Sequence, residues 1–260
     1  MDGVVRLSII NFSLIYILLV IVLLAMKRAG VQKIKLLIIA SVRMTIQLIL
    51  VGFLLQYIFR NSNPGFTALF IIAMLIFSVH RVLKGQRRMN FKFKIITGLS
   101  LAISGLTVLI FFVVVVVSEN IFNPRYTIPL AGMIIGNAMT GVSLGIKTFT
   151  ESVELESAKI ETLLNLGASP KKILKPFVSK GLETALIPTL NSMLGMGIIF
   201  LPGMMTGQIL SGTLPTTAIM YQIAIMIAIC ASVCLSVFTA LEFGNKTLYN
   251  KRGQFDFNRN

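Results

Sequence analysis

Few side chains in this sequence could carry out catalysis. The chain of 260 residues has one histidine, His80, and two cysteines, Cys230 and Cys234. Neither a Ser-His-Asp triad nor the usual Cys/His spacing of a zinc site can be built from this single histidine. Residues 244–247 (GNKT) lack the second glycine of a phosphate-binding P-loop, so any ATP has to bind to another chain. We therefore expect no catalytic residue and no cofactor in this chain.

Polar side chains within long apolar runs are better candidates for contact with a transported solute. Asn137 and Thr140 lie three positions apart in one run, and Asn191 and Ser192 are adjacent in a later one. Polar groups at membrane depth should face protein or a water-filled cavity. We predict that both pairs line a central pathway.

Methionine is frequent in the last three apolar runs, and Met193 and Met196 follow the second polar pair. Thioethers bind soft metals such as Cu(I), but they also fill gaps between moving helices. We favour the second role and keep Met193 and Met196 as pathway candidates. No Asp or Glu lies deep in a predicted span, so these helices lack the usual side-chain ligands of Fe(II). Glu183, at the entrance of the sixth span, is the nearest candidate metal ligand, although a helix-end charge is the plainer role for it.

Composition indicates a membrane protein. Hydrophobic residues make up 55% of the chain and charged residues 13%, and apolar runs recur that can cross about 30 Å of hydrocarbon. We expect a single all-α permease domain with about seven transmembrane helices, at 4–26, 36–59, 66–79, 95–118, 128–146, 182–201 and 215–241. The link at 202–214 is apolar enough to lie at membrane depth as a broken helix.

The fifth predicted span carries four glycines at paired spacing, Gly132 with Gly136 and Gly141 with Gly145. Small residues four apart let helix backbones approach closely in lipid. Close packing is therefore favoured over direct contact with a substrate.

Basic residues are divided unevenly between the loops. Of the 24 Lys and Arg residues, twenty fall in 27–35, 81–94, 147–180 and 241–260, and only three fall in the alternate loops. The positive-inside rule places the first group in the cytoplasm, with the N-terminus outside and the C-terminus inside. Topology therefore explains the net charge of +15 better than nucleic-acid binding does. The same face should favour anionic membrane lipid.

A charged, helix-prone segment at 147–180 separates the fifth and sixth spans. Gly167 follows a helical pattern where a left-handed residue would end the helix. Ser169 and Pro170 fit the N-cap and first position of the next helix. The sequence predicts a cytoplasmic helix-turn-helix, called the elbow here, which is suited to docking a partner.

The elbow resembles the "EAA" coupling loop of ABC-transporter permeases, which inserts into a cleft of the ATPase subunit. The matching residues are Glu161, Gly167, Ala168, Ser169 and Pro170. Thr162 and Leu163 replace the two alanines usual in that loop. Three longer segments, 128–144, 187–212 and 221–226, are similar to the Fet-type iron-export ABC permeases, which the plant aluminium-tolerance half-transporter permeases also resemble.

The resemblance implies a permease subunit in the plasma (inner) membrane that exports iron or another metal ion. It also implies a homodimer joined to a separate ABC ATPase subunit, which binds ATP and Mg and contacts the five matching elbow residues. Two alternatives stay open. One is an ABC permease for a metal complex, an amphipathic molecule or a nucleotide sugar, because the spans lack carboxylates. The other is a membrane scaffold or receptor that transports nothing.

Overall fold

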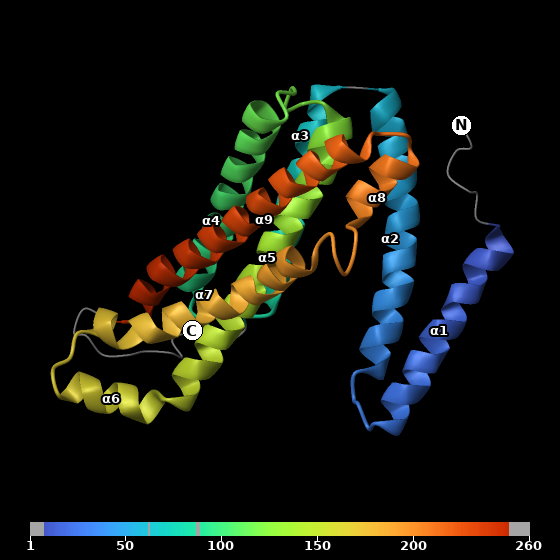
Figure 1. The fold of residues 1–260 in the computed structure, drawn as a ribbon. Coiled ribbons are helices and arrows are strands. Elements are labelled where there is room, and N and C mark those ends of the chain that lie inside the picture. Colours follow the sequence, from blue (N-terminus) through green and yellow to red (C-terminus); the bar gives the residue numbers. More distant parts are fainter. Residues whose placement is uncertain (1–7, 62, 87–88, 250–260) are drawn as a thin grey trace.

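The computed structural model describes residues 8–61, 63–86 and 89–249 of the chain (Figure 1). These residues form nine α-helices, one π-helical turn (η1, Phe112–Val116) and one 3-10 turn (η2, Asn245–Leu248), with no β-strand among them. The predicted all-α class is confirmed.

Among the described residues, six helices are long and apolar enough to cross a membrane. They are α1 (Ile9–Arg28), α2 (Ile34–Arg60), α3 (Pro64–Lys84), α4 (Phe91–Phe111, continued by η1), α5 (Pro124–Leu155) and α9 (Pro215–Gly244). The other three are α6 (Ser157–Asn165), α7 (Pro170–Gly195) and α8 (Gly203–Leu210). The first four residues of the predicted first span, 4–7, lie outside the described part of the chain.

Asparagine side chains begin the helices in the middle of the chain. Asn63, Asn90 and Asn123 are the N-caps of α3, α4 and α5, and each side chain accepts a backbone N–H of the first turn. Proline follows directly at the first position of α3 and α5, where its missing N–H costs nothing. These local signals explain why the helices start where they do.

The prediction of a sixth span at 182–201 as one helix is wrong. Helix α7 begins in the charged segment at Pro170 and ends at Gly195. Non-helical backbone follows, with Gly197 at φ +83°, and the short helix α8 completes the crossing toward the start of α9 (Figure 1). Apolar residues continue through the break, so hydropathy alone could not reveal it.

The ends of the bundle alternate as the charge pattern requires. Figure 1 shows the turn between α1 and α2, helix α6 and the end of α9 at one end of the bundle. The turns between α2 and α3 and between α8 and α9 lie at the other end. The basic segments 27–35 and 147–180 therefore share one end. The orientation of that end toward the cytoplasm stays a prediction.

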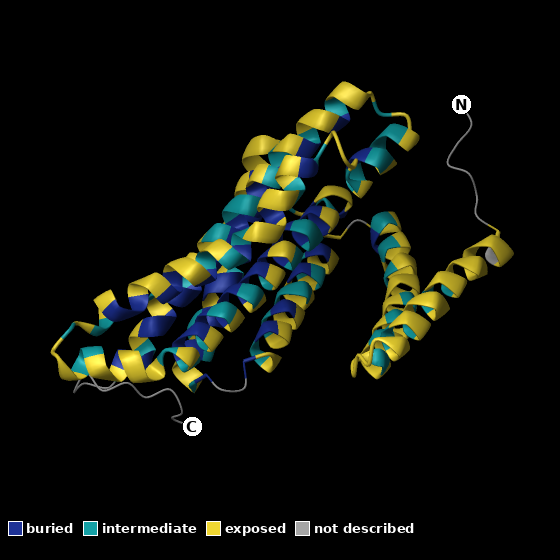
Figure 2. Ribbon diagram, turned by 60° about the horizontal axis from the view of Figure 1, so that its bottom comes forward, coloured by how far each residue is buried: buried dark blue, intermediate teal, exposed yellow. Residues whose placement is uncertain are grey.

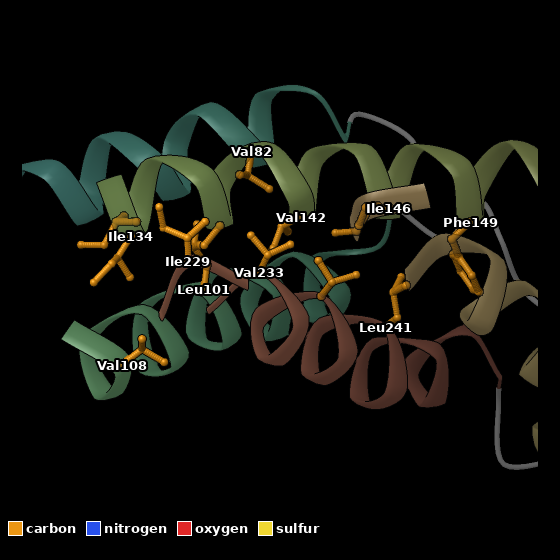
Figure 3. Packing of buried hydrophobic residues seen from close by; sticks show 14 of the residues in the cluster. Val82, Leu101, Val108, Ile134, Val142, Ile146, Phe149, Ile229, Val233 and Leu241 are labelled. Carbon is orange, nitrogen blue, oxygen red and sulfur yellow. The ribbon is translucent and has the colours of Figure 1, made fainter. Parts of the chain in front are cut away.

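The buried core lies between α3, α4, α5, α7 and α9 (Figures 2 and 3). Figure 3 shows Val142 of α5 beside Val233 of α9. Gly141 permits this approach, because a Cβ there would lie 2.6 Å from Cγ1 of Val233. The predicted close packing at Gly141 is therefore confirmed, whereas a Cβ on Gly136 would meet nothing within 4 Å.

A second close approach joins α5 to α7 at Gly145 and Gly181. A Cβ on Gly181 would lie 2.9 Å from the carbonyl oxygen of Gly145, and one on Gly145 would lie 3.1 Å from the carbonyl oxygen of Gly181. Because the obstacle is backbone on both sides, neither helix can accept a side chain here without moving. This crossing fixes α7 against α5.

Helices α1 and α2 form a hairpin that is largely exposed (Figure 2). A hydrogen bond of 2.7 Å joins the hydroxyls of Tyr16 and Thr45 within the hairpin. The guanidinium of Arg43 lies 5.6 Å from the ring centre of Phe77 in α3, within cation–π range. The hairpin thus contacts the core mainly along one side of α2.

Candidate functional site

The elbow is a well-formed turn between α6 and α7. Gly167 has φ +82°, the left-handed conformation expected of a helix stop. Its N–H donates to the carbonyl of Leu164 at 2.9 Å, and the N–H of Ala168 donates to that of Leu163 at 3.0 Å. This pair of hydrogen bonds is a Schellman motif, so the prediction of a helix stop at Gly167 is confirmed.

The next helix starts where the sequence predicts. Ser169 is the N-cap of α7 and Pro170 its first residue, although the Ser169 side chain makes no capping hydrogen bond. The hydroxyl of Tyr249, beyond α9, donates to the carbonyl of Pro170 at 3.3 Å. Burial raises the pKa of Tyr249, so its hydroxyl stays protonated and able to donate. Lys171 also lies 3.9 Å from Glu242 at the end of α9.

The elbow presents only some of its predicted contact residues outward. Glu161, Gly167 and Ser169 are exposed, whereas Pro170 is half-buried. Ala168 is also half-buried and packs against the hydrophobic core. Ile160 anchors α6 from below, with 1% of its surface exposed. The turn is therefore packed against the core through Ala168 and Ile160, while Glu161, Gly167 and Ser169 stay exposed to a partner.

The first pair of predicted pathway residues lies on an exposed face of α5. The amide nitrogen of Asn137 donates to the carbonyl of Met133 at 2.7 Å, and the hydroxyl of Thr140 donates to that of Gly136 at 3.1 Å. Both side chains point away from the core. In lipid such a face would be unfavourable unless protein or water covers it.

The same face of α5 continues to a cavity that the sequence analysis missed. Ser143, Lys147 and Glu151 follow at helical spacing and line a cavity of about 610 Å³ with the end of α3. Lys147 lies 3.8 Å from Glu151. Both amide atoms of Gln86, on the cavity wall, are buried without a hydrogen-bond partner. The helical spacing of Ser143, Lys147 and Glu151 could have indicated the α5 side of this cavity from the sequence. No sequence pattern indicates that the end of α3 lies opposite.

The second pair lies near the end of α7. Asn191 and Met193 are exposed, and the hydroxyl of Ser192 donates to the carbonyl of Pro188 at 2.9 Å. Met196 is the first residue beyond the helix. Glu183 is exposed two residues beyond Gly181 of the glycine crossing. The described residues contain no group of three or more His, Cys, Asp or Glu that could hold a metal.

The two pairs lie at comparable distances along their helices from the crossing of Gly145 and Gly181. Measured from the Gly145–Gly181 crossing, Asn137 is about 12 Å along α5 and Asn191 about 15 Å along α7, at 1.5 Å per residue. No hydrogen bond between the pairs is present in the described part of the chain. Asn137, Thr140 and Asn191 are therefore exposed at the surface of the single chain.

The long apolar helices define a multi-pass α-helical membrane protein. Residues 9–249 match the model of the uncharacterised protein family UPF0014, and the chain belongs to this family.

Several relatives cover most of the chain. The probable iron export permease protein FetB of Escherichia coli (strain K12) is 35% identical over 216 residues, 82% of this chain and 81% of the relative. Protein ALUMINUM SENSITIVE 3 of Arabidopsis thaliana is 37% identical over 80% of this chain and 76% of its own length. The UPF0014 membrane protein YjkA of Bacillus subtilis (strain 168) is 31% identical over 84% of this chain and 85% of its own. No solved structure matches the chain. The resemblance to Fet-type permeases is confirmed.

Proposed function

We propose that this chain is the membrane subunit of an ATP-driven exporter of iron or another metal ion in the plasma membrane. The observation that carries the proposal is the elbow, a satisfied turn with Glu161, Gly167 and Ser169 exposed at its surface. A separate ABC ATPase subunit docks there and binds the ATP and Mg. The substrate class is drawn from the E. coli relative, which is named as a probable iron export permease.

The helices beside the elbow are suited to transmitting movement of the ATPase into the membrane. Helix α5 continues without a break to Leu155, and α7 begins at Pro170. The two helices cross at Gly145 and Gly181 with backbone nearly in contact. Because packed helices move as stiff units, a displacement of the elbow shifts both walls that carry the predicted pathway residues.

A second copy of this chain covers the exposed polar face in this proposal. Asn137 and Thr140 face outward on α5, and Gly136 leaves open space beside them for another helix. The pathway then lies between the two copies and is lined by both polar pairs, Met193 and Met196. Glu183 would offer a carboxylate to a cation at the cytoplasmic entrance of this helix. Anionic lipid would contact the basic residues at the same end.

One observation favours a metal complex as an alternative substrate. The described residues hold no cluster of metal-binding side chains, so a bare ion would find few side-chain ligands within the membrane. A metal carried with its own ligands, an amphipathic molecule or a nucleotide sugar would need fewer. A scaffold that transports nothing is the remaining alternative.

Transport by the reconstituted complex tests the proposal. The permease and its ATPase would be purified together, placed in liposomes, and supplied with ATP and Fe²⁺, Mn²⁺ or Zn²⁺ on the ATPase side. We expect ATP-dependent accumulation of at least one metal and faster ATP hydrolysis in its presence. A complex that assembles but moves no metal refutes metal export. Failure of the chain to bind the ATPase refutes the docking role as well. Liposomes with an ATPase unable to hydrolyse ATP are the control.

A further inference from the structure

The break between α7 and α8 is an ordered turn. The carbonyl of Gly195 accepts the N–H groups of Ile199, at 2.9 Å, and Phe200, at 3.4 Å. The N–H of Gly197 donates to the carbonyl of Phe200 at 3.0 Å. Gly197 has φ +83°, which disfavours any side chain. A Cβ on Gly195 would lie 3.0 Å from the Phe200 ring. The sequence therefore ends the helix at a defined point.

This turn lies within the membrane. Residues 184–195 of α7 carry no charge and span about 18 Å at 1.5 Å per residue, against about 30 Å of hydrocarbon. Figure 1 shows α7 ending partway along α9, with α8 covering the remaining distance. Ile198 is 90% exposed and Ile199 80% exposed. Non-helical backbone at this depth is tolerated only where protein or a water-filled cavity covers it.

The end of α7 leaves carbonyl groups free. The N–H of Gly197 bonds to the carbonyl of Phe200 rather than back to α7. The carbonyls of Met193 and Leu194 consequently accept no backbone hydrogen bond from the residues that follow the helix, 196–200. Pro188 has no N–H, so the carbonyl of Thr184 also lacks its helical partner.

We propose that the free carbonyl oxygens of Met193 and Leu194 form an intramembrane binding site for a partly dehydrated divalent metal cation. The C-terminal end of a helix carries partial negative charge and attracts cations. Carbonyl oxygens are ligands for hard divalent ions, and the exposed amide of Asn191 can add another oxygen. Residues 184–241 contain no charged side chain, so main-chain oxygen is the strongest ligand set available there.

This site would add a cation-binding position to the proposed export pathway, and its place on that pathway rests on the proposed function. Binding of a cation can nevertheless be measured without transport. The Met193 thioether lies on the same turn but is not required, because the proposed carbonyl ligands come from the main chain. The Met193→Leu variant should therefore still bind a hard ion such as Mn²⁺.

Replacing one peptide bond by an ester tests the carbonyls directly. Incorporating the α-hydroxy acid of leucine at position 194 keeps every side chain and weakens the carbonyl of Met193 as a ligand. The matched control is the same replacement at Leu186, also inside α7. Each of the two variants loses one helical N–H, so they differ only in which carbonyl is weakened. Electron paramagnetic resonance measures Mn²⁺ binding to the purified full chain, assembled with its ATPase in nanodiscs. We expect the ester at position 194 to weaken binding by about ten-fold or more and the control ester to leave it unchanged.

A glycine pair supplies a second test. A Cβ at either Gly197 or Gly207 would meet nothing within 4 Å, but only Gly197 has positive φ. Gly197→Ala should therefore disturb the turn and weaken Mn²⁺ binding, whereas Gly207→Ala should match the unmodified chain.

The outcomes separate the two proposals. Equal Mn²⁺ binding by both ester variants, or no Mn²⁺ binding by the unmodified chain, overturns the carbonyl site even when Fe²⁺ transport is intact. Binding that depends on the ester at position 194, in a complex that transports no metal, supports the site and refutes export.

Discussion

Helix α7 lies between two glycine turns that have nearly the same backbone and opposite surroundings. Gly167 has φ +82° and Gly197 has φ +83°. At the elbow, the turn returns two N–H groups to the last carbonyls of α6. At the break, the N–H groups of Ile199 and Phe200 both bond to the single carbonyl of Gly195, and the carbonyls of Met193 and Leu194 stay free.

The difference shows that a glycine stop alone does not determine what a helix end does. The backbone carbonyls at the elbow could hydrogen-bond to water at little cost. They accept N–H groups of the turn instead, which gives the elbow a fixed shape. The break lies among uncharged, largely apolar residues, yet it leaves the carbonyls of Met193 and Leu194 free. A fixed shape suits a contact that transmits movement, and free carbonyls suit a ligand.

The two turns are connected through the glycine crossing of α7 with α5. Gly181 lies between them along the helix, and its backbone is packed against that of Gly145. Movement at the elbow can therefore reach the break only if this crossing holds. Four substitutions test this comparison, from the largest expected effect to the smallest.

Gly181→Val should have the largest effect. Its side chain would collide with the carbonyl of Gly145 and with Cδ1 of Leu241, each 2.9 Å from the first added carbon. Overpacking of this kind costs about 1–3 kcal/mol or more, and two helices would have to separate. We expect a large loss of folded protein, measured as monodisperse yield and thermal stability in detergent. Gly207→Val, where nothing lies within 4 Å, is the control. Equal stability of both variants would show that α7 is not fixed at the crossing.

Gly167→Val and Glu161→Lys should leave the fold intact and uncouple the ATPase. The strain at Gly167 is about 1–2 kcal/mol, which is small against a typical stability of about 5–15 kcal/mol. We expect loss of ATPase binding, or about ten-fold less substrate-stimulated ATP hydrolysis, because a re-aimed turn or reversed charge no longer fits the partner. Mn²⁺ binding should persist in both variants, unlike in Gly197→Ala. Full coupling in both variants would remove the elbow from the mechanism.

Tyr249→Phe should have the smallest effect. It removes the hydrogen bond from the hydroxyl to the carbonyl of Pro170, worth about 1 kcal/mol. We expect a fall of a few degrees in the melting temperature and faster hydrogen exchange at the start of α7. The control is Tyr126→Phe at an exposed position. No change in exchange near Pro170 would mean that this bond does not stiffen the elbow.

Local signals made the elbow predictable from the sequence. Gly167, Ser169 and Pro170 specify a stop and a restart within four positions, so no distant contact is needed to locate the turn. The small-residue spacing at Gly141 and Gly145 likewise indicated close packing. The partners, Val233 and Gly181, could not be identified, because they lie far away in the chain and depend on how the helices pair.

The break at the end of α7 was placed wrongly for a physical reason. Hydropathy measures how well side chains suit lipid, and Ile198, Ile199 and Leu201 suit it well. It does not measure whether the backbone is hydrogen-bonded. The cavity beside Gln86 was missed because its walls come from α3 and α5, which only the tertiary structure brings together.

The interrupted crossing also has a consequence for biosynthesis. Helix α7 has Lys180 and Glu183 near its uncharged part, which ends after Gly195, so it is a poor substrate for the translocon by itself. A nascent chain should therefore retain α7 at the interface until α9 emerges and inserts with α8 as a hairpin. Glycosylation mapping of chains truncated at residue 202 and at residue 249 would detect this delay, and stable insertion of the shorter chain would contradict it.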